Sequence, residues 1–218
     1  MSQVYPRPNV IFFDAVGTLF GVRGSVGEIY ADLAKPYGVH ADAKLLNGAF
    51  FRAFKAAPSM AFPGVDLYSI AAREFSWWKA IAQQTFADAG VLDQFSHFDH
   101  FFDGLYQHFA TAKPWFVYPD TLETLKYWQA QGVEVGIISN FDSRIHQVLT
   151  ALNLSGLFNS ITISTEVGAA KPDSLIFKVA LEKHHCLPSQ AWHIGDTLRD
   201  DYEGARTAGL RGILLERS

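Results

Sequence analysis

Four separate segments of this chain carry side chains whose types could perform chemistry. They are FFDAVGTLF with Asp14, IISN ending at Asn140, AAKPD with Lys171, and GDTLRDD from Gly195 to Asp201. A carboxylate can act as a nucleophile, an ammonium can hold an oxyanion, and grouped carboxylates can bind a divalent cation. Together these residue types predict a site for covalent catalysis on a phosphorylated or acidic substrate.

Asp14 is the candidate nucleophile. It ends an apolar run, Gly17 lets the backbone turn tightly past the carboxylate, and Thr18 offers a hydroxyl to orient it. An aspartate placed in this way can attack phosphorus or an activated carbon and form a covalent intermediate. Taken alone, the same carboxylate could cap the next helix, but its sequence context favours the nucleophile.

Ser139, Asn140 and Lys171 are the candidates for holding the transferring group. The Lys171 ammonium, facing several carboxylates, would offset their mutual repulsion and bind a phosphoryl or carboxylate oxygen. A hydroxyl and an amide at a strand end can bind the oxygens of a transferring group. The alternatives are a surface lysine and a pair of helix-capping residues.

Asp196, Asp200 and Asp201 stand close together in GDTLRDD. Free anions crowd at one site only at a large electrostatic cost, and a hard cation such as Mg²⁺ relieves it by taking carboxylate oxygens into an octahedral shell. Asp200 and Asp201 can equally form an acidic pair that favours a helix N-terminus. Both interpretations can hold at once, and the segment predicts a Mg²⁺ site.

The elements that must position these residues alternate between strands and helices. Short buried strands are predicted at Val10–Phe13, Val133–Ile138, Ile161–Ser164, Trp192–Ile194 and Gly212–Leu215. Strands that alternate with helices form a parallel sheet covered on both faces. The predicted class is therefore α/β, a doubly wound, Rossmann-like parallel sheet. Ligands bind beyond the carboxyl ends of such strands, where the four segments would converge.

The helices between these strands carry start signals. Asp120 followed by Glu123 has the pattern of a capping box, and Asp142 is placed to cap a helix that runs to about Leu152. A third helix is expected after Pro172. These helices would cover the faces of the sheet.

Residues 21–112 contain no convincing strand. Helical patterns cover Val26–Lys35, Ala41–Lys55, Leu67–Ala87 and Phe95–Ala110. An all-helical cap inserted into the α/β core is the simplest account, because a structureless loop of that length is uncommon in a compact domain. We therefore divide the chain into a discontinuous core, residues 1–20 and 113–218, and a helical cap, residues 21–112.

Composition and charge restrict the partners and the compartment. The net charge is −4 with no basic run, which argues against nucleic acid and anionic membrane as partners. No apolar stretch is long enough for a signal peptide or a spanning helix. Cys186 is the only cysteine, which precludes an internal disulfide and fits a reducing compartment. We expect a cytoplasmic protein that acts on a small molecule.

The four segments together resemble the signature motifs of the haloacid dehalogenase superfamily, whose members use an aspartate as nucleophile. The helical cap is similar to that of subfamily I, and FDAVGTL, ISNFDSR and GDTLRDDYEGARTAG resemble the branch of rhythmically expressed protein homologues. The resemblance implies hydrolysis of a phosphate ester with Mg²⁺ as cofactor. It also implies that Asp14, the Val16 carbonyl, Asp196 and a second acidic residue hold the metal. Asp201 fits the second position better than Asp200.

Val16 is the departure from the phosphatase pattern. In the phosphatases an aspartate at this position protonates the leaving group and later activates water, and valine does neither. Substrates with good leaving groups, such as acyl phosphates, would suffer least; otherwise a cap residue or a bound water would supply the proton.

Two alternatives to a phosphatase follow from Val16. One is a catalytically weak or inactive regulatory protein that binds phosphate, and the other is a metal-independent 2-haloacid dehalogenase. Dehalogenases also lack the second aspartate, but they do not use Mg²⁺ and lack the acidic pair that Asp196 and Asp201 form here. Phosphoester or acyl-phosphate hydrolysis is therefore the favoured interpretation.

Two further positions concern the substrate. Arg144, in NFDSR directly after the second motif, is the candidate for contact with a phosphorylated or acidic small molecule. Trp77 and Trp78 cannot both face one side of a helix, so one of them is expected to line the cleft or an interface.

Overall fold

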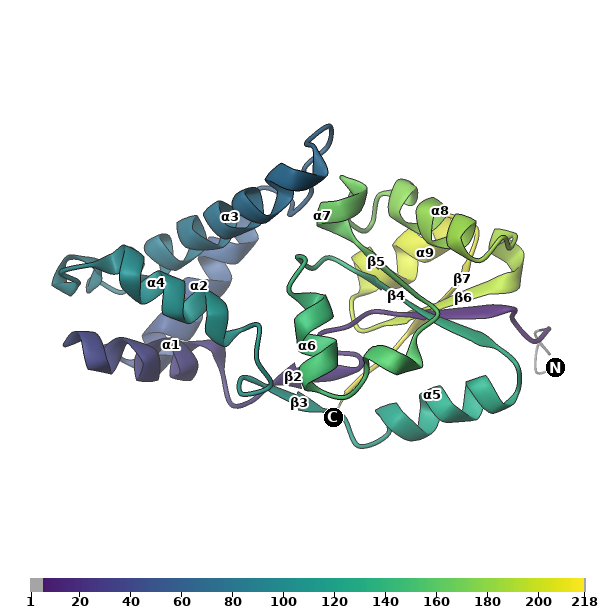
Figure 1. The fold of residues 1–218 in the computed structure, drawn as a ribbon, viewed down its shortest axis with the longest axis horizontal. Helices are drawn as coiled ribbons and strands as arrows, with labels where there is room; N and C mark the ends of the chain where they lie inside the picture. Colours follow the sequence, from purple (N-terminus) through teal and green to yellow (C-terminus); the bar gives the residue numbers. More distant parts are fainter. Residues whose placement is uncertain (1–5, 218) are drawn as a thin grey trace.

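A parallel sheet of five strands forms the centre of the larger half of the molecule (Figure 1). In the computed structural model, which describes residues 6–217, the strands are β1 (Val10–Phe13), β4 (Glu134–Ser139), β5 (Ser160–Ile163), β6 (Ala191–Gly195) and β7 (Arg211–Leu214). Their order is β5-β4-β1-β6-β7, and every neighbouring pair is parallel. The α/β class is confirmed, and each predicted strand lies within one residue of its observed bounds.

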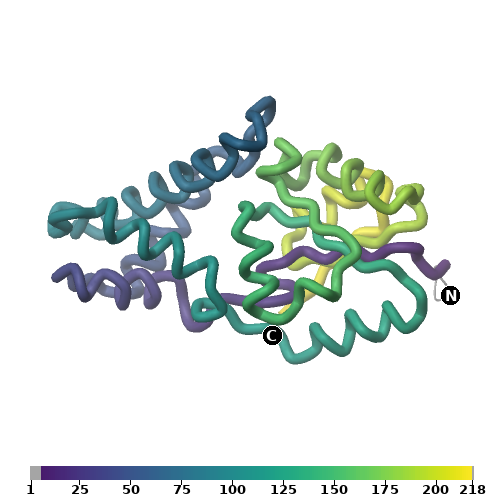
Figure 2. Tube along the Cα trace, in the orientation of Figure 1, coloured from purple at the N-terminus to yellow at the C-terminus, as the bar shows by residue number. Residues whose placement is uncertain are grey.

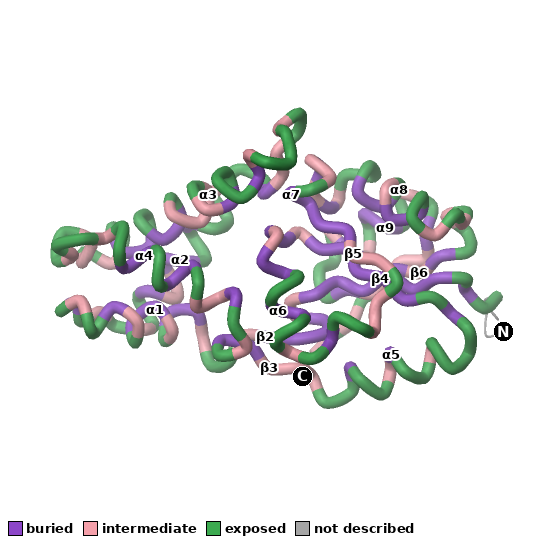
Figure 3. Tube along the Cα trace, in the orientation of Figure 1, coloured by how far each residue is buried: buried purple, intermediate pink, exposed green. Residues whose placement is uncertain are grey.

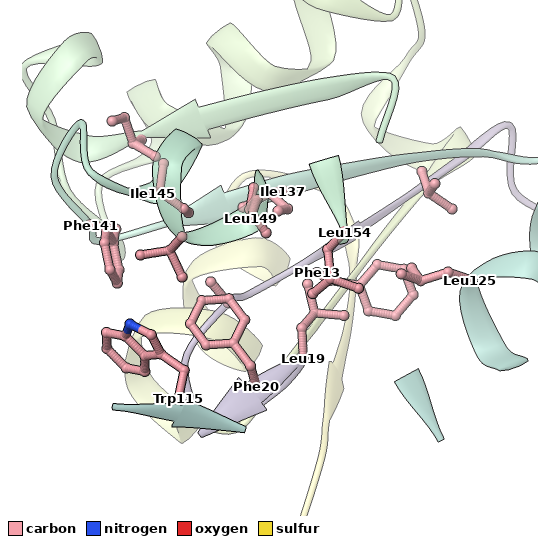
Figure 4. Packing of buried hydrophobic residues seen from close by; sticks show 14 of the residues in the cluster. Phe13, Leu19, Phe20, Trp115, Leu125, Ile137, Phe141, Ile145, Leu149 and Leu154 are labelled. Atoms are coloured by element: carbon pink, nitrogen blue, oxygen red, sulfur yellow. The ribbon is translucent and has the colours of Figure 1, made fainter. Parts of the chain in front are cut away.

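The central strand is wholly apolar because both faces of the sheet are covered. Successive side chains of β1 point to opposite faces, so that Ile11 and Phe13 enter one core while Val10 and Phe12 enter the other. Figure 4 shows the first of these cores. Apolar burial on two faces fixes the register of the sheet and thereby the positions of the residues that follow its strands.

Helices cover each face. Helices α5 (Thr121–Ala130) and α6 (Ile145–Ala151) pack on the face of Ile11, and α8 (Ser174–Lys183) and α9 (Gly204–Thr207) pack on the face of Phe12. Short elements complete the core and the connections: α7 (Ser164–Val167), a π-helical segment at Leu198–Glu203, and 3₁₀ turns at Lys35–Tyr37, Leu92–Gln94, Ser155–Leu157 and Pro188–Gln190. Of the helices within residues 6–217, none combines the length and apolar character that crossing a bilayer requires.

Two of the predicted start signals differ from what the structure shows. Asp120 precedes α5 but its side chain does not cap the helix; its carboxylate pairs with Arg217, at 2.5 Å. The Asp142 carboxylate accepts the backbone N–H of Arg144, the residue directly before α6, at 2.9 Å, but it accepts none from α6 itself. It is buried and also accepts hydrogen bonds from the Arg144 side chain and from the cap residue Trp78. In both cases a distant side chain, Arg217 or Trp78, binds a carboxylate that the local pattern assigned to the helix.

Four helices form the cap, which the chain builds between β1 and the return to the sheet (Figure 2). They are α1 (Val26–Ala34), α2 (Ala43–Ala56), α3 (Leu67–Asp88) and α4 (Phe98–His108). Ser25, Asp42 and Asp66 each accept a backbone N–H of the following helix, which satisfies a donor that the first turn leaves free. The helices bury a second, aromatic-rich core of their own, as the inward purple faces in Figure 3 show.

An antiparallel ribbon joins the cap to the core. It consists of β2 (Phe20–Val22) and β3 (Trp115–Val117), neither of which the sequence predicted. Each strand has three residues, too few for a periodic signal, and they pair only because the two ends of the cap segment meet. The ribbon lies where we propose that the cap is inserted, next to residues 20 and 113.

Candidate active site

The predicted site residues meet at the carboxyl edge of the sheet. Asp14 directly follows β1, and its backbone N–H donates to the Ile194 carbonyl of β6 at 2.9 Å. Ser139 ends β4, the other neighbour of β1, and Asp196 follows β6. The parallel register therefore brings these three segments to one edge, as such sheets do at their ligand sites.

Lys171 is the centre of this cluster. Its Nζ donates to Asp14 Oδ1 at 2.6 Å, to Asp201 Oδ1 at 2.5 Å and to the Ile138 carbonyl at 3.0 Å. The ammonium thus uses all three of its hydrogens on buried acceptors. Burial alone would lower the pKa of Lys171, but the two carboxylates raise it above the ordinary value, so the side chain is charged.

Asp201 is buried and has several donors. His193 Nε2 lies 2.8 Å from its Oδ1, and the backbone N–H and hydroxyl of Thr197 donate to its Oδ2 at 3.0 and 2.5 Å. Burial works to raise the pKa of Asp201, but the His193 hydrogen bond and the Lys171 charge hold it well below its ordinary value. Burial lowers the pKa of His193, which is therefore neutral, and Nε2 must carry the hydrogen that Asp201 accepts. Asp201 is thereby kept ionised.

Asp196 is the exposed carboxylate of the cluster. The Thr18 hydroxyl donates to Asp196 Oδ1 at 3.3 Å. Thr18 therefore orients Asp196, whereas the sequence predicts that it orients Asp14. Gly17 has a φ of 89°, and a Cβ there would lie 2.4 Å from Asp196 Oδ2. Only glycine lets the turn after Asp14 approach the second carboxylate so closely.

Asp14, Asp196 and Asp201 offer oxygens that lie within 4.8 Å of one another. Of the two neighbouring aspartates, Asp201 belongs to this cluster and Asp200 does not. Burial raises the pKa of Asp14 and of Asp196, and the neighbouring carboxylates raise both further. A bound cation would relieve this repulsion, so the donor set suits a hard divalent ion.

The Val16 carbonyl is also available to a cation. Among residues 6–217 no backbone hydrogen bond ends on it, although its neighbours Ala15 and Phe20 both use their carbonyls. Unlike the carbonyl, the Val16 side chain lines an apolar cavity of about 290 Å³ between cap and core. The position that carries an acid in phosphatases is therefore part of an apolar wall here.

The Asn140 and Ser139 side chains differ in their hydrogen bonds. Asn140 Nδ2 donates to the Lys171 carbonyl at 3.0 Å, and the Lys171 backbone N–H donates to Asn140 Oδ1 at 2.7 Å. Its amide thus fixes the Lys171 backbone rather than facing a transferring group. Within residues 6–217 the Ser139 hydroxyl makes no hydrogen bond, so it is available to a substrate oxygen.

Arg144 lines the cavity, but its charge is already paired. Its Nε and one terminal nitrogen donate to the two Asp142 oxygens at 2.8 and 2.6 Å, and the other terminal nitrogen donates to the Tyr106 carbonyl at 2.8 Å. The guanidinium lies over the Tyr106 ring at 3.7 Å, and Trp78 donates to Asp142 at 2.6 Å. The expectation that one tryptophan of the pair lines the cleft is met by Trp78. A direct substrate role for Arg144 stays a prediction.

A second polar contact between cap and core was not predicted at all. Glu74 of α3 is fully buried and accepts from the Ser143 N–H at 2.8 Å, from the Ser143 hydroxyl at 2.5 Å and from the Thr165 hydroxyl at 2.6 Å. Nothing in the local sequence distinguishes Glu74 from a surface glutamate on a helix. Together with the Trp78–Asp142 bond it holds α3 against the core beside the cleft.

Replacing Lys171 by methionine is expected to reduce the free energy of unfolding by about 3–5 kcal/mol, because Asp14 and Asp201 would be left as buried charges without a cation. In the wild type, the low pKa of Asp201 contributes stability that is lost as the pH falls through the range where aspartate titrates. In the variant, the Asp14 carboxyl, whose pKa burial raises even beside Lys171, would lose its cation, so the contribution of Asp14 to stability would increase as the pH falls.

Urea denaturation at neutral and acidic pH measures this difference, which should be largest at neutral pH. Lys178→Met is the matched control, because Lys178 pairs with Glu182 on the surface at 3.9 Å and should contribute about 0–1 kcal/mol. If both variants lost the same free energy of unfolding, Lys171 would not be compensating the buried charges of Asp14 and Asp201.

Comparison with known proteins gives relatives over nearly the whole chain. A family profile described as haloacid dehalogenase-like hydrolase matches residues 8–209. Haloacid dehalogenase-like hydrolase domain-containing protein 3 of Mus musculus is 34% identical over 210 residues, which cover 96% of this chain and 82% of the mouse protein. The Rhythmically expressed gene 2 protein of Drosophila melanogaster is 27% identical over 220 residues, covering 96% and 83%.

Solved structures share the fold at lower identity. A HAD phosphatase from Thermococcus onnurineus has a TM-score of 0.63 at 21% identity, covering 96% of this chain and 87% of that one. L-2-haloacid dehalogenase from Xanthobacter autotrophicus has a TM-score of 0.66 at 18% identity, covering 93% and 75%. Proteins named for two different chemistries therefore have this fold, so the reaction must be argued from the side chains of the site.

Proposed function

This chain belongs to the haloacid dehalogenase-like hydrolase family, and on that premise we propose that it hydrolyses phosphate esters or acyl phosphates through a covalent intermediate on Asp14, with Mg²⁺ as cofactor. The observation that carries the proposal is the state of the Asp14 carboxylate. Lys171 holds its Oδ1 at 2.6 Å, while Oδ2 accepts no hydrogen bond within residues 6–217. One oxygen is positioned and the other is free to attack.

In the first step, Asp14 Oδ2 attacks phosphorus and the bond from phosphorus to the leaving-group oxygen breaks. The product is a phosphoryl group on Asp14, and the leaving group departs with the electron pair of the broken bond. The Ser139 hydroxyl would hold a phosphoryl oxygen. The Lys171 ammonium has no hydrogen left for the substrate, but its positive charge beside Asp14 would stabilise the negative charge of the transferring group. Asn140 acts on this step indirectly, because it fixes the backbone of Lys171.

The donor set fits Mg²⁺, with Asp14, Asp196 and the Val16 carbonyl as the groups that would hold it. When bound, the ion would neutralise the negative charge of the transferring group. Asp201 is committed to Lys171, His193 and Thr197 through both of its oxygens. We therefore propose that Asp201 positions Lys171 and adds negative charge to the site, in addition to its predicted role as a ligand of the metal.

In the second step, water attacks phosphorus, phosphate leaves and the Asp14 carboxylate is restored. A general base would normally remove the proton from this water, and Val16 cannot. Nor do the residues that line the cavity within the described chain include a histidine, aspartate or glutamate. The second step is therefore expected to be the slow one for substrates whose leaving group needs no proton.

The test is a rapid-mixing measurement with p-nitrophenyl phosphate and acetyl phosphate in the presence of Mg²⁺. We expect a burst of nitrophenol close to the enzyme concentration, followed by turnover slower by about 10²–10⁴-fold than the burst, because the second step lacks its base. A chelator should abolish both phases. Linear release without a burst would show that the second step does not limit the reaction.

Two other outcomes would point to the alternative functions. Binding of Mg²⁺ and phosphate esters without release of either product would indicate a phosphate-binding protein without turnover. Halide release from a 2-haloacid in the presence of chelator would indicate a dehalogenase. The acidic cluster of Asp14, Asp196 and Asp201 argues against the second outcome, since an attack on carbon with halide as leaving group gains nothing from three grouped carboxylates.

A further inference from the structure

The cavity between cap and core begins at the reactive edge of the sheet. Val16, two residues after the nucleophile, and Asn140, which holds Lys171, form part of its lining. Its remaining walls come mainly from aromatic and aliphatic side chains of the cap helices and of the ribbon. A group attached to a phosphoryl centre at Asp14 would therefore extend into this cavity.

The cavity offers a substrate no unpaired charge. Among its lining residues Arg144 carries the only charge, and Asp142 pairs with it through both oxygens. The Tyr30 hydroxyl makes no hydrogen bond within residues 6–217, and burial raises the pKa of Tyr30, so the hydroxyl stays protonated and uncharged. A second phosphate, a carboxylate or an ammonium on the substrate would lose its hydration here without compensation.

Part of the apolar lining is exposed to solvent. Phe51 and Phe54, on α2, are 56% and 42% exposed, and both belong to the cavity. Covering large exposed aromatic side chains is favourable, and such patches mark sites of binding. The wall behind them is held in place, because Trp78 donates to Asp142 and the Arg144 guanidinium reaches the Tyr106 carbonyl. A preformed wall lowers the cost of ordering the site on binding.

The volume sets the size of the group. The cavity of about 290 Å³ is roughly twice the size of an apolar cavity of about 150 Å³ that accommodates one benzene ring. It therefore has room for a bicyclic aromatic ring, whereas a single ring would leave part of the space empty. The cavity is too apolar for a sugar and lacks partners for its several hydroxyls.

We propose that this cavity is the leaving-group subsite and that it takes an uncharged, largely apolar group of about the size of a bicyclic ring. This rests on the proposed function, and it defines the substrate class as monophosphates of apolar, chiefly aromatic, groups. Val16 then has a role of its own: it continues the apolar wall to the reacting centre, where an aryl oxide can depart without a proton donor. Sugar phosphates and nucleotides fall outside the class.

The experiment compares 1-naphthyl phosphate with phenyl phosphate, whose leaving groups are of comparable acidity, with ribose 5-phosphate as the polar case. We expect kcat/KM for the naphthyl ester to exceed that for the phenyl ester by roughly 15- to 250-fold, since each of the four added buried carbons contributes about a two- to fourfold gain. Phe51→Ala should reduce this ratio about three- to tenfold. The matched control is Leu45→Ala, on the same helix, because Leu45 is 63% exposed and lies outside the cavity.

Binding to the Asp14→Asn variant, measured by calorimetry, separates this proposal from the proposed function. Tighter binding of the naphthyl ester, lost in a Phe51→Ala background, would support the subsite even if the wild type turned over neither ester. Turnover of both aryl esters at equal kcat/KM would leave the hydrolase in place and overturn the subsite. Preference for ribose 5-phosphate, or failure of both aryl esters to bind, would overturn it as well.

Discussion

Replacing Asp14 by asparagine is expected to lower phosphate release from acetyl phosphate by roughly 10⁴-fold or more, since removal of a covalent nucleophile is among the largest single losses that enzymes show. The amide of asparagine has nearly the same shape but does not attack phosphorus. The burst of nitrophenol should vanish with it, because no phosphoryl group can form on residue 14. Stopped-flow release of nitrophenol and acid-quench detection of the phosphoprotein measure the two effects.

The control for this variant is Asp200→Asn. Asp200 is the neighbour of Asp201 but makes none of the contacts through which Asp201 holds Lys171, so its loss should change the rate by only a few-fold. Asp201→Asn, in contrast, removes the charge that Lys171 pairs with and should be strongly impaired. A burst that survives in Asp14→Asn would exclude Asp14 as the nucleophile.

Replacing Val16 by aspartate should raise the steady-state rate by about 10²–10⁴-fold, which is what a general acid–base group typically contributes. The new carboxyl would remove the proton from the attacking water, so the slow second step should speed up and the burst should disappear. It would also protonate alkyl leaving groups, which the wild type cannot do. The gain should therefore be larger for an alkyl phosphate than for acetyl phosphate, as steady-state assays of both would show.

The environment of residue 16 sharpens the test. Val16 lies in an apolar wall, and burial against such a wall raises the pKa of a carboxyl, which favours a protonated side chain able to act as an acid. Val16→Asn has the same size and polarity but transfers no proton, so it should remain as slow as the wild type. Equal rates for the aspartate and asparagine variants would mean that residue 16 does not limit the reaction.

Comparing the activities of the wild type and Val16→Asp also distinguishes the alternative functions. An inactive wild type that gains activity only with Val16→Asp would indicate a site that binds phosphate but does not turn it over. An active wild type whose aryl-ester activity falls in Val16→Asp, while alkyl-ester activity rises, would indicate that the valine serves the apolar subsite. The same substitution thus tests the chemistry and the substrate class.

Much of the fold could be predicted because it depends on local patterns. The run Val10–Phe13 is apolar at every position, as a strand covered on both faces must be, and the cap helices have recurring apolar positions on one side. The strands β2 and β3 could not be predicted, because three residues show no period and their pairing requires both ends of the cap segment to meet. The Asp120 and Asp142 caps were wrong for a related reason, since distant arginine and tryptophan side chains compete for those carboxylates.

By itself, the sequence determined which groups stand at the reactive edge. Asp14 and Asp196 follow strands that pair in parallel, and Ser139 is the last residue of another such strand. Parallel pairing brings the carboxyl ends of these strands to the same edge of the sheet, independently of the loops. It also determined that position 16 has no acid. Only the tertiary structure decided how these groups are used, because their partners come from loops far apart in the chain.

Asn140 and Lys171 illustrate this difference. Both side chains were candidates to bind a substrate, but the 30 residues between them fold so that the Asn140 amide holds the Lys171 backbone. Likewise, the Thr18 hydroxyl donates to Asp196, and the Arg144 guanidinium forms an ion pair with Asp142. Residue types and strand order are properties of the sequence. A hydrogen bond is a property of distance, and distances between separate segments exist only once the cap and the sheet have packed together.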